Sequence, residues 1–119
     1  MALTASDDTT AKIWSASTEE CLQTLFGHIG PVYSAMFSED RALALTASDD
    51  ATAKIWSAPT GECLQTLSHD DCVNSAMFSA DGALALTASE DFTAKIWSAS
   101  TGECLQTLSH DACVRSATF

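Results

Sequence analysis

The sequence has 119 residues, 46% of them hydrophobic, and a formal net charge of −11. This length and apolar content suit one modest folded domain, whereas the negative charge opposes binding to nucleic-acid phosphates. No apolar run approaches the roughly 20 residues that span a bilayer, and the opening "MALTASDD" is not a secretory signal. We therefore expect a cytoplasmic protein with no nucleic-acid or membrane partner.

The predicted elements are short strands from one end of the sequence to the other. The first is "ALTAS" at residues 2–6, and the last is Cys113–Phe119. Between them, runs rich in Thr, Ile, Val, Leu and aromatic residues alternate with turn-forming residues such as "SADGA". The middle of the chain contains a complete set of four runs: Ala42–Ser48, Thr52–Trp56, Glu62–Leu67 and Cys72–Phe78. Because no segment has a useful helical stripe, the predicted fold class is all-β.

Three copies of one repeat make up the chain. The second and third copies, which begin at Leu45 and Leu86, differ at only six of their aligned positions. Several strands are apolar on both faces, which is typical of sheets covered on both sides. Each copy therefore predicts a four-stranded antiparallel blade stacked face to face on its neighbours. We place the repeat units of this single three-blade segment at residues 3–44, 45–85 and 86–119.

A period of about 41 residues with four strands and a Trp is the signature of WD-repeat propellers. The motifs "LTASDDATAKIW", "TGECLQTL", a His and "V-x-S-A-x-F-S-x-D-G" follow one another here in the family's order. The chain resembles a WD-repeat β-propeller protein along essentially its whole length. It departs from the family pattern after each Trp, where Ser15, Ser57 and Ser98 replace Asp, and the Gly-His pair survives only at Gly27-His28.

The resemblance implies a buried polar network in each blade. In this family a loop His binds a turn Asp, and a strand Thr or Ser links that His to the Trp indole. Such a network is physically sound because a buried indole N–H and a buried carboxylate each need a hydrogen-bond partner. The matching residues are His28, Thr46, Asp50 and Trp56 in one blade, and His69, Thr87, Asp91 and Trp97 in the next.

The same residue types could be interpreted as a catalytic triad or a metal pair. A set that recurs with every blade is an architectural device, however, and no oxyanion loop accompanies it. We therefore expect no enzyme activity and no bound cofactor or metal. The odd count of five cysteines and the absence of C-x-x-C oppose disulfides and zinc. We interpret the recurring Cys21, Cys63 and Cys104 as core residues.

One set of network residues is incomplete in the sequence. Thr4, Asp8 and Trp14 have no His before them, whereas His110 and the strand Cys113–Phe119 have no blade after them. We expect the two parts to meet between copies of the chain, in a head-to-tail contact that closes into a ring. The last strand of one copy would then complete the first blade of the next.

The family's blade angle favours one ring size. Family propellers with seven or eight blades have wedges of about 45–51°. Three chains give nine blades at about 40°, and two chains give six blades at about 60°. We favour the nine-bladed homotrimer over the six-bladed homodimer. A fragment of a longer WD-repeat scaffold protein, or an engineered self-assembling propeller without a specific ligand, stays open as an alternative.

The resemblance also implies a partner-binding surface on the narrower top face. Tyr33, Asn74 and Arg115 occupy one equivalent position there and differ between copies, as on a binding face built on a constant scaffold. Neutral drift of exposed positions would give the same variation. The expected function is a non-catalytic scaffold for protein–protein interaction, with protein or peptide ligands on this face. The candidate residues are Asp7, Pro31, Tyr33, Asp49, Cys72, Asn74, Glu90, Cys113 and Arg115.

Overall fold

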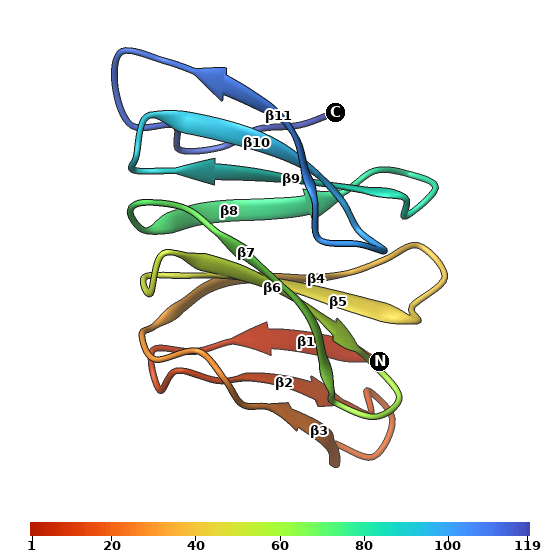
Figure 1. Ribbon diagram of the computed structural model, residues 1–119. Coiled ribbons are helices and arrows are strands. Elements are labelled where there is room, and N and C mark those ends of the chain that lie inside the picture. Colours follow the sequence, from red (N-terminus) through yellow and green to blue (C-terminus); the bar gives the residue numbers. More distant parts are fainter.

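The computed structural model describes residues 1–119 as a stack of three antiparallel sheets (Figure 1). The first sheet has three strands, β1 (Ala2–Ala5), β2 (Ala11–Trp14) and β3 (Cys21–Leu25). The second has four strands, β4 (Val32–Phe37), β5 (Leu43–Ser48), β6 (Thr52–Ser57) and β7 (Cys63–Ser68). The third repeats this order with β8 (Val73–Phe78), β9 (Leu84–Ser89), β10 (Thr93–Ser98) and β11 (Cys104–Ser109). The all-β prediction is confirmed, with a complete four-stranded meander in the second and third sheets.

Apolar side chains on both faces of each sheet hold the stack together. Ile55 and Trp56 are adjacent in β6, so they point to opposite faces. Ile55 packs with the third sheet in a cluster of 11 buried residues, and Trp56 packs with the first sheet in a cluster of seven. The strand register shifts between these two residues, and a bulge of this kind increases local twist. The second sheet is therefore covered on both sides, as its apolar strands predicted.

The predicted strand Cys113–Phe119 is not a strand within the single chain, so the first sheet keeps three strands. The segment nevertheless has a defined position. The Val114 N–H donates to the Ser89 carbonyl at 2.9 Å, as the Val32 N–H donates to the Ser6 carbonyl at 3.0 Å. The segment therefore starts where the first strand of a following blade would start. It lies beside the third sheet, at the opposite end of the stack from β1–β3 (Figure 1).

The prediction that Cys21, Cys63 and Cys104 fill the core is wrong. All three are exposed, and all five cysteines are free thiols. The reason is their position on β3, β7 and β11, the outer strand of each sheet. A neighbouring blade covers the ends of β3 and β7 at Leu25 and Leu67, which are 0% exposed, but not their beginnings, and β11 is exposed along its whole length. The structure contains no helix with the length and apolar character needed to cross a membrane.

Candidate functional site

A buried hydrogen-bonded network links two strands of the second sheet, β5 and β6, with the loop before β4 and the turn between β5 and β6. His28 Nδ1 lies 2.8 Å from Asp50 Oδ2, and His28 Nε2 lies 2.7 Å from Thr46 Oγ1. The Trp56 indole N–H donates to the same Thr46 oxygen at 2.9 Å. The structure thus brings together the four residues that the resemblance assigned to this blade.

The partners of His28 determine its tautomer. Because an ionised carboxylate can only accept, His28 Nδ1 must donate to Asp50. The Nε2 atom of the neutral ring then accepts the Thr46 hydroxyl proton, and the Thr46 oxygen accepts from Trp56. Each side-chain polar atom of this four-residue network has a hydrogen-bond partner, as buried polar groups require. The neutral imidazole is therefore the form that fits the site.

The pKa values have the direction that this arrangement predicts. Burial lowers the pKa of His28, and the hydrogen bond to Asp50 opposes burial without overcoming it. Burial alone would raise the pKa of Asp50, but hydrogen bonds from Thr52, His28 and the Ile29 N–H hold it below its usual value. The ring stays neutral and the carboxylate stays ionised at neutral pH.

Two supporting residues of the network were missed in the sequence. The N–H and hydroxyl of Thr52 donate to Asp50 Oδ1 at 2.9 and 2.6 Å. The Asp50 N–H donates to Ser48 Oγ, and the Ser48 hydroxyl donates to the Pro31 carbonyl. The signal was present, because every copy reads S-x-D-x-T at this turn. An Asp followed two residues later by Thr is a pattern typical of a side-chain-capped turn.

The third sheet repeats the network. His69 Nδ1 lies 2.8 Å from Asp91 Oδ2, and His69 Nε2 lies 2.6 Å from Thr87 Oγ1. Trp97 donates to Thr87 at 2.9 Å. Burial lowers the pKa of His69. Burial alone would raise the pKa of Asp91, but hydrogen bonds from Thr93 and His69 hold it far below the usual carboxyl range. Two of the three blades are therefore complete in this respect.

The first sheet holds only part of a network. Trp14 donates to Thr4 Oγ1 at 2.9 Å, and Asp8 accepts the N–H and hydroxyl of Thr10, but no His joins them. Thr4 is exposed, whereas Thr46 is 0% exposed. His110 lies at the other end of the stack and is exposed, although its backbone N–H donates to the Phe92 carbonyl as that of His69 donates to Ala51. The structure does not bring His110 and Thr4, Asp8 and Trp14 together in one chain.

Each end of the stack has an open apolar face. The open front face belongs to the third sheet and includes Leu108, which is 44% exposed although its equivalents Leu25 and Leu67 are 0% exposed. The open rear face belongs to the first sheet and includes Trp14, which is half-buried although Trp56 is 1% exposed. A hollow of about 430 Å³ lies on the open rear face. Its lining residues are Ala2, Thr4, Trp14, Ser15, Ala16 and Glu19.

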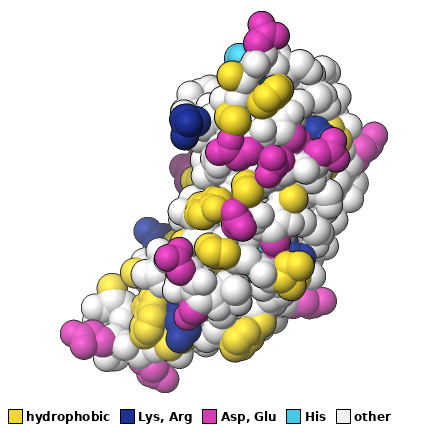
Figure 2. Space-filling model, turned by 90° about the vertical axis from the view of Figure 1, so that its left-hand side faces the viewer, with side chains coloured by type: hydrophobic (Ala, Val, Ile, Leu, Met, Phe, Trp, Pro, Cys, Tyr) yellow, Lys and Arg dark blue, Asp and Glu magenta, His cyan; other side chains and the backbone are white.

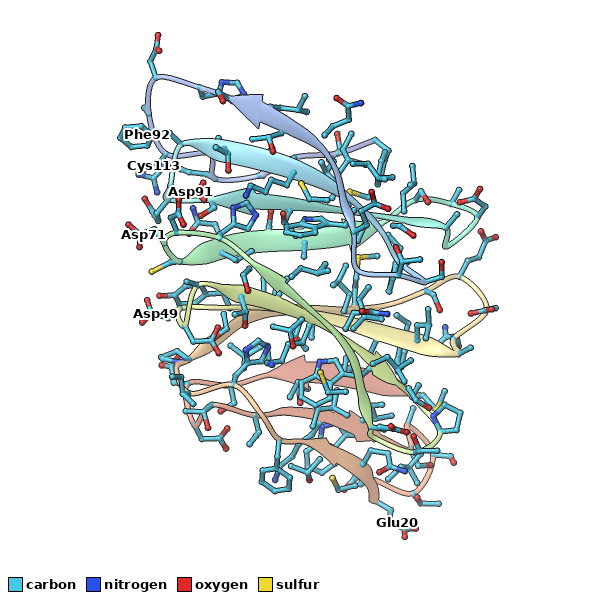
Figure 3. All side chains as sticks on the ribbon, in the orientation of Figure 1. Glu20, Asp49, Asp71, Asp91, Phe92 and Cys113 are labelled. Atoms are coloured by element: carbon cyan, nitrogen blue, oxygen red, sulfur yellow. The ribbon has the colours of Figure 1, made fainter.

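Loop residues of the proposed top face gather along one edge of the stack. Asp49 accepts hydrogen bonds from the Tyr33 hydroxyl and from Cys72 Sγ, which comes from the next blade. These bonds to Asp49 raise the pKa of Tyr33 to about 12 and that of Cys72 to about 12. In the view that faces this edge, acidic side chains are spread between hydrophobic ones (Figure 2). Labelled along it in Figure 3 are Asp49, Asp71, Asp91, Phe92 and Cys113.

The other candidate residues of the top face differ in their hydrogen bonds and in their exposure to solvent. Asn74 Nδ2 donates to the Val114 carbonyl at 3.0 Å, so its amide holds the C-terminal segment. A hydrogen bond to Glu90 raises the pKa of Cys113. Asp7 and Arg115 are exposed, and Pro31 is half-buried. The structure therefore joins Tyr33, Asp49 and Cys72 across one blade junction. Backbone hydrogen bonds extend this cluster, because the Asp49 N–H donates to the Pro31 carbonyl and the Glu90 N–H donates to the Cys72 carbonyl, both at 2.9 Å.

A comparison with protein families agrees with the repeat architecture. The family model described as "WD domain, G-beta repeat" matches residues 19–57 and 61–98, together more than half of the chain. The first match runs from the turn after β2 to the end of β6, and the second covers the turn after β6 through β10. The chain belongs to the WD40 repeat family.

Proposed function

We propose that this protein is a non-catalytic WD40 scaffold whose copies join head to tail into a closed propeller ring. WD40 repeat domains are in general protein–protein interaction modules. The finer part of the proposal is the ring, for which we favour three chains and nine blades over two chains and six. The five free thiols suit a reducing compartment, and we place the module in the cytoplasm.

The observation that carries the proposal is the complementarity of the two ends of the stack. The open rear face has Thr4, Asp8 and Trp14 without a His, and the opposite end has an exposed His110. Placing one copy on another as the third sheet sits on the second would bring His110 to this incomplete network. The segment Cys113–Phe119 would then lie beside β1 of that copy.

The cost of leaving the faces uncovered also supports association. Leu108 and Trp14 are more exposed than their equivalents Leu67 and Trp56, which neighbouring blades cover. Burying their apolar surface would stabilise the protein by about 25 cal/mol per Å². Repeat units of this kind gain stability chiefly from contacts with neighbouring units. A face with the same residues as an internal junction is best covered by the same kind of blade.

For the scaffold role we propose that the top face binds basic segments of proteins or peptides. The chain has 16 acidic residues against five basic ones, and Asp49, Asp71 and Asp91 lie along this edge (Figure 3). Charge complementarity of this kind speeds encounter and selects partners. Retention of basic peptides that is lost on changing Asp49 and Asp71 together to Asn would support the role. Equal retention by the variant would exclude this face.

Solution mass tests the ring. One chain has a mass of 12.5 kDa. Light scattering on dilute protein should give about three times this mass for the homotrimer, or about twice this mass for the homodimer. His110→Ala should lower the mass while leaving the circular dichroism spectrum and the unfolding midpoint of the separated chain unchanged. His69→Ala should lower the midpoint instead, since its network lies inside one chain. A single-chain mass at all concentrations would overturn the ring and favour a segment of a longer WD40 protein.

A further inference from the structure

Each blade junction inside the chain has a hydrogen bond at its outer side. Gln23 Nε2 on β3 donates to the Pro59 carbonyl at 2.7 Å, and Gln65 Nε2 on β7 donates to the Ser100 carbonyl at 2.9 Å. Both acceptors lie in the turn that follows the Trp strand of the next sheet. The bond therefore joins the outer strand of one blade to the lower turn of the next.

These turns need glycine for two separate reasons. Gly61 and Gly102 both have φ of 74°, in the left-handed region that favours glycine. A Cβ at Gly61 would lie 2.8 Å from Gln23 Oε1, and a Cβ at Gly102 would lie 2.5 Å from Gln65 Oε1. Contacts below 3.0 Å are essentially never seen for real Cβ atoms. A Cβ at either turn would therefore force the end of the glutamine side chain to move from the position in which it makes this bond.

The first sheet has the same turn with a different residue. Glu19 has φ of 62°, and its N–H donates to the Ser15 carbonyl at 2.9 Å, as the Gly61 N–H donates to Ser57 at 2.8 Å. Glu19 also lines the hollow on the open rear face. At the other end, Gln106 on β11 is exposed. Gln106 is thus the only one of the three glutamines whose equivalent turn would carry a side chain.

We propose that Glu19 weakens the head-to-tail junction between copies by excluding the side chain of Gln106 from the hydrogen bond that Gln23 and Gln65 make within the chain. This inference rests on the proposed ring. The occupant of the open rear face is a second copy of the chain, because the face continues a junction that already occurs twice in the molecule. Gln106 of that copy swings away from the Glu19 Cβ and loses the bond to the Ser17 carbonyl. The junctions between chains are then the places where the ring opens.

The experiment is a dilution series by analytical ultracentrifugation on the full chain. Glu19→Gly should tighten association by roughly 3- to 10-fold per junction, the range of one net hydrogen bond. Glu19→Gln removes the charge but keeps the Cβ, so it should not tighten association. Gln106→Ala should change the wild type little, but it should abolish the gain of Glu19→Gly in the double variant.

The outcomes separate this inference from the ring. Equal tightening by Glu19→Gly and Glu19→Gln would overturn the steric role, because charge alone would explain it. An associating wild type that Glu19→Gly leaves unchanged would overturn the inference and leave the ring standing. Single chains for the wild type and for Glu19→Gly alike would overturn both. Gly102→Glu provides a control inside one chain, where it should lower the unfolding midpoint through the strained φ of the turn and the Gln65 contact together.

Discussion

His28 Nε2 lies 2.7 Å from Thr46 Oγ1, and both residues are buried. One hydroxyl group therefore serves two partners, because the same oxygen accepts the Trp56 indole N–H at 2.9 Å. The hydroxyl donates in one direction and accepts in the other, which neither a methyl group nor an amide can do in the same volume. Thr46 is thus the residue on which the connectivity of the second blade depends.

Replacing Thr46 with Val should lower the free energy of unfolding by about 2–6 kcal/mol, since two buried polar groups lose a partner at about 1–3 kcal/mol each. The change keeps the shape of the side chain, so the loss reports the hydroxyl. Urea unfolding followed by Trp fluorescence measures it. Thr46→Ser retains the hydroxyl and should lose less. Thr4→Val, at the exposed equivalent position of the first sheet, should have a smaller effect in the separated chain. Equal losses for Thr46→Val and Thr4→Val would contradict the burial argument.

Acidification should destabilise the separated chain. Burial lowers the pKa of His28 and His69, so the unfolded chain takes up protons below its histidine pKa of about 6.5 while the folded chain does not. Stability should therefore fall as the pH drops below about 6.5. The lowered pKa of Asp50 acts in the same direction at lower pH, since its contribution disappears as the carboxylate protonates.

The urea midpoint measured from pH 8 to pH 5 checks this prediction. His28→Gln should flatten the profile. His110→Gln is the matched control, and it should not lower the midpoint of the separated chain at pH 8 because the His110 side chain is exposed and outside both networks. A midpoint that stays constant or rises on acidification would show that the buried histidines do not control stability.

Thiol chemistry should separate the cysteines into two groups. Cys21, Cys63 and Cys104 are exposed on the outer strands and should react rapidly with a thiol reagent near pH 8. Cys72 should react slowly, because its hydrogen bond to Asp49 raises its pKa to about 12 and the thiolate is the reactive form. Mass spectrometry of the labelled peptides gives the order. Asp49→Asn should accelerate labelling of Cys72 alone, and labelling of Cys72 as fast as Cys63 in the wild type would contradict the assignment.

The turn after each network Asp stores backbone strain. Ala51 has φ of 73°, in the left-handed region that costs a residue other than glycine roughly 1–3 kcal/mol. Ala51→Gly should therefore raise the free energy of unfolding by about 0.5–1 kcal/mol, after the entropy that glycine adds to the unfolded chain. Ala53→Gly, in the buried part of β6, should lower it. A lower urea midpoint for Ala51→Gly would show that the methyl group of Ala51 contributes more than its strained backbone costs.

Much of the fold was predictable because the repeat supplied three versions of the same pattern. The predicted strand at Thr52–Trp56 agrees with β6 at Thr52–Ser57 within one residue, and the apolar pair Ile55 and Trp56 indicated a sheet covered on both faces. The assignment of Cys63 to the core failed for a physical reason. Recurrence shows that a position is equivalent in every blade, but an outer strand has one uncovered end, and only the packed structure shows which residues lie there.

The residues of the candidate site also fall into those that could be predicted from the sequence and those that needed the structure. His28, Asp50, Thr46 and Trp56 could be matched to the family, whereas the roles of Ser48 and Thr52 depend on the turn geometry around Asp50. The repeat alignment places Glu19 where the other copies have Gly61 and Gly102, but its effect on a neighbouring blade could not be predicted from the sequence. Its significance comes from a distance between the Gly61 turn and Gln23 on a different blade, and such contacts depend on how the sheets are stacked.

Association of the chains should weaken as the pH falls below about 6.5, the range in which an imidazole in water takes up a proton. In the proposed ring His110 enters a network like those of His28 and His69, where burial lowers the histidine pKa. A neutral imidazole is the form that fits such a network, as at His28, so acidification opposes assembly. Sedimentation at pH 7.5 and pH 5.5 measures the shift in mass. His110→Gln should associate more weakly at pH 7.5 but lose much of the pH dependence, and an unchanged dependence would place the responsible group elsewhere than at the junction.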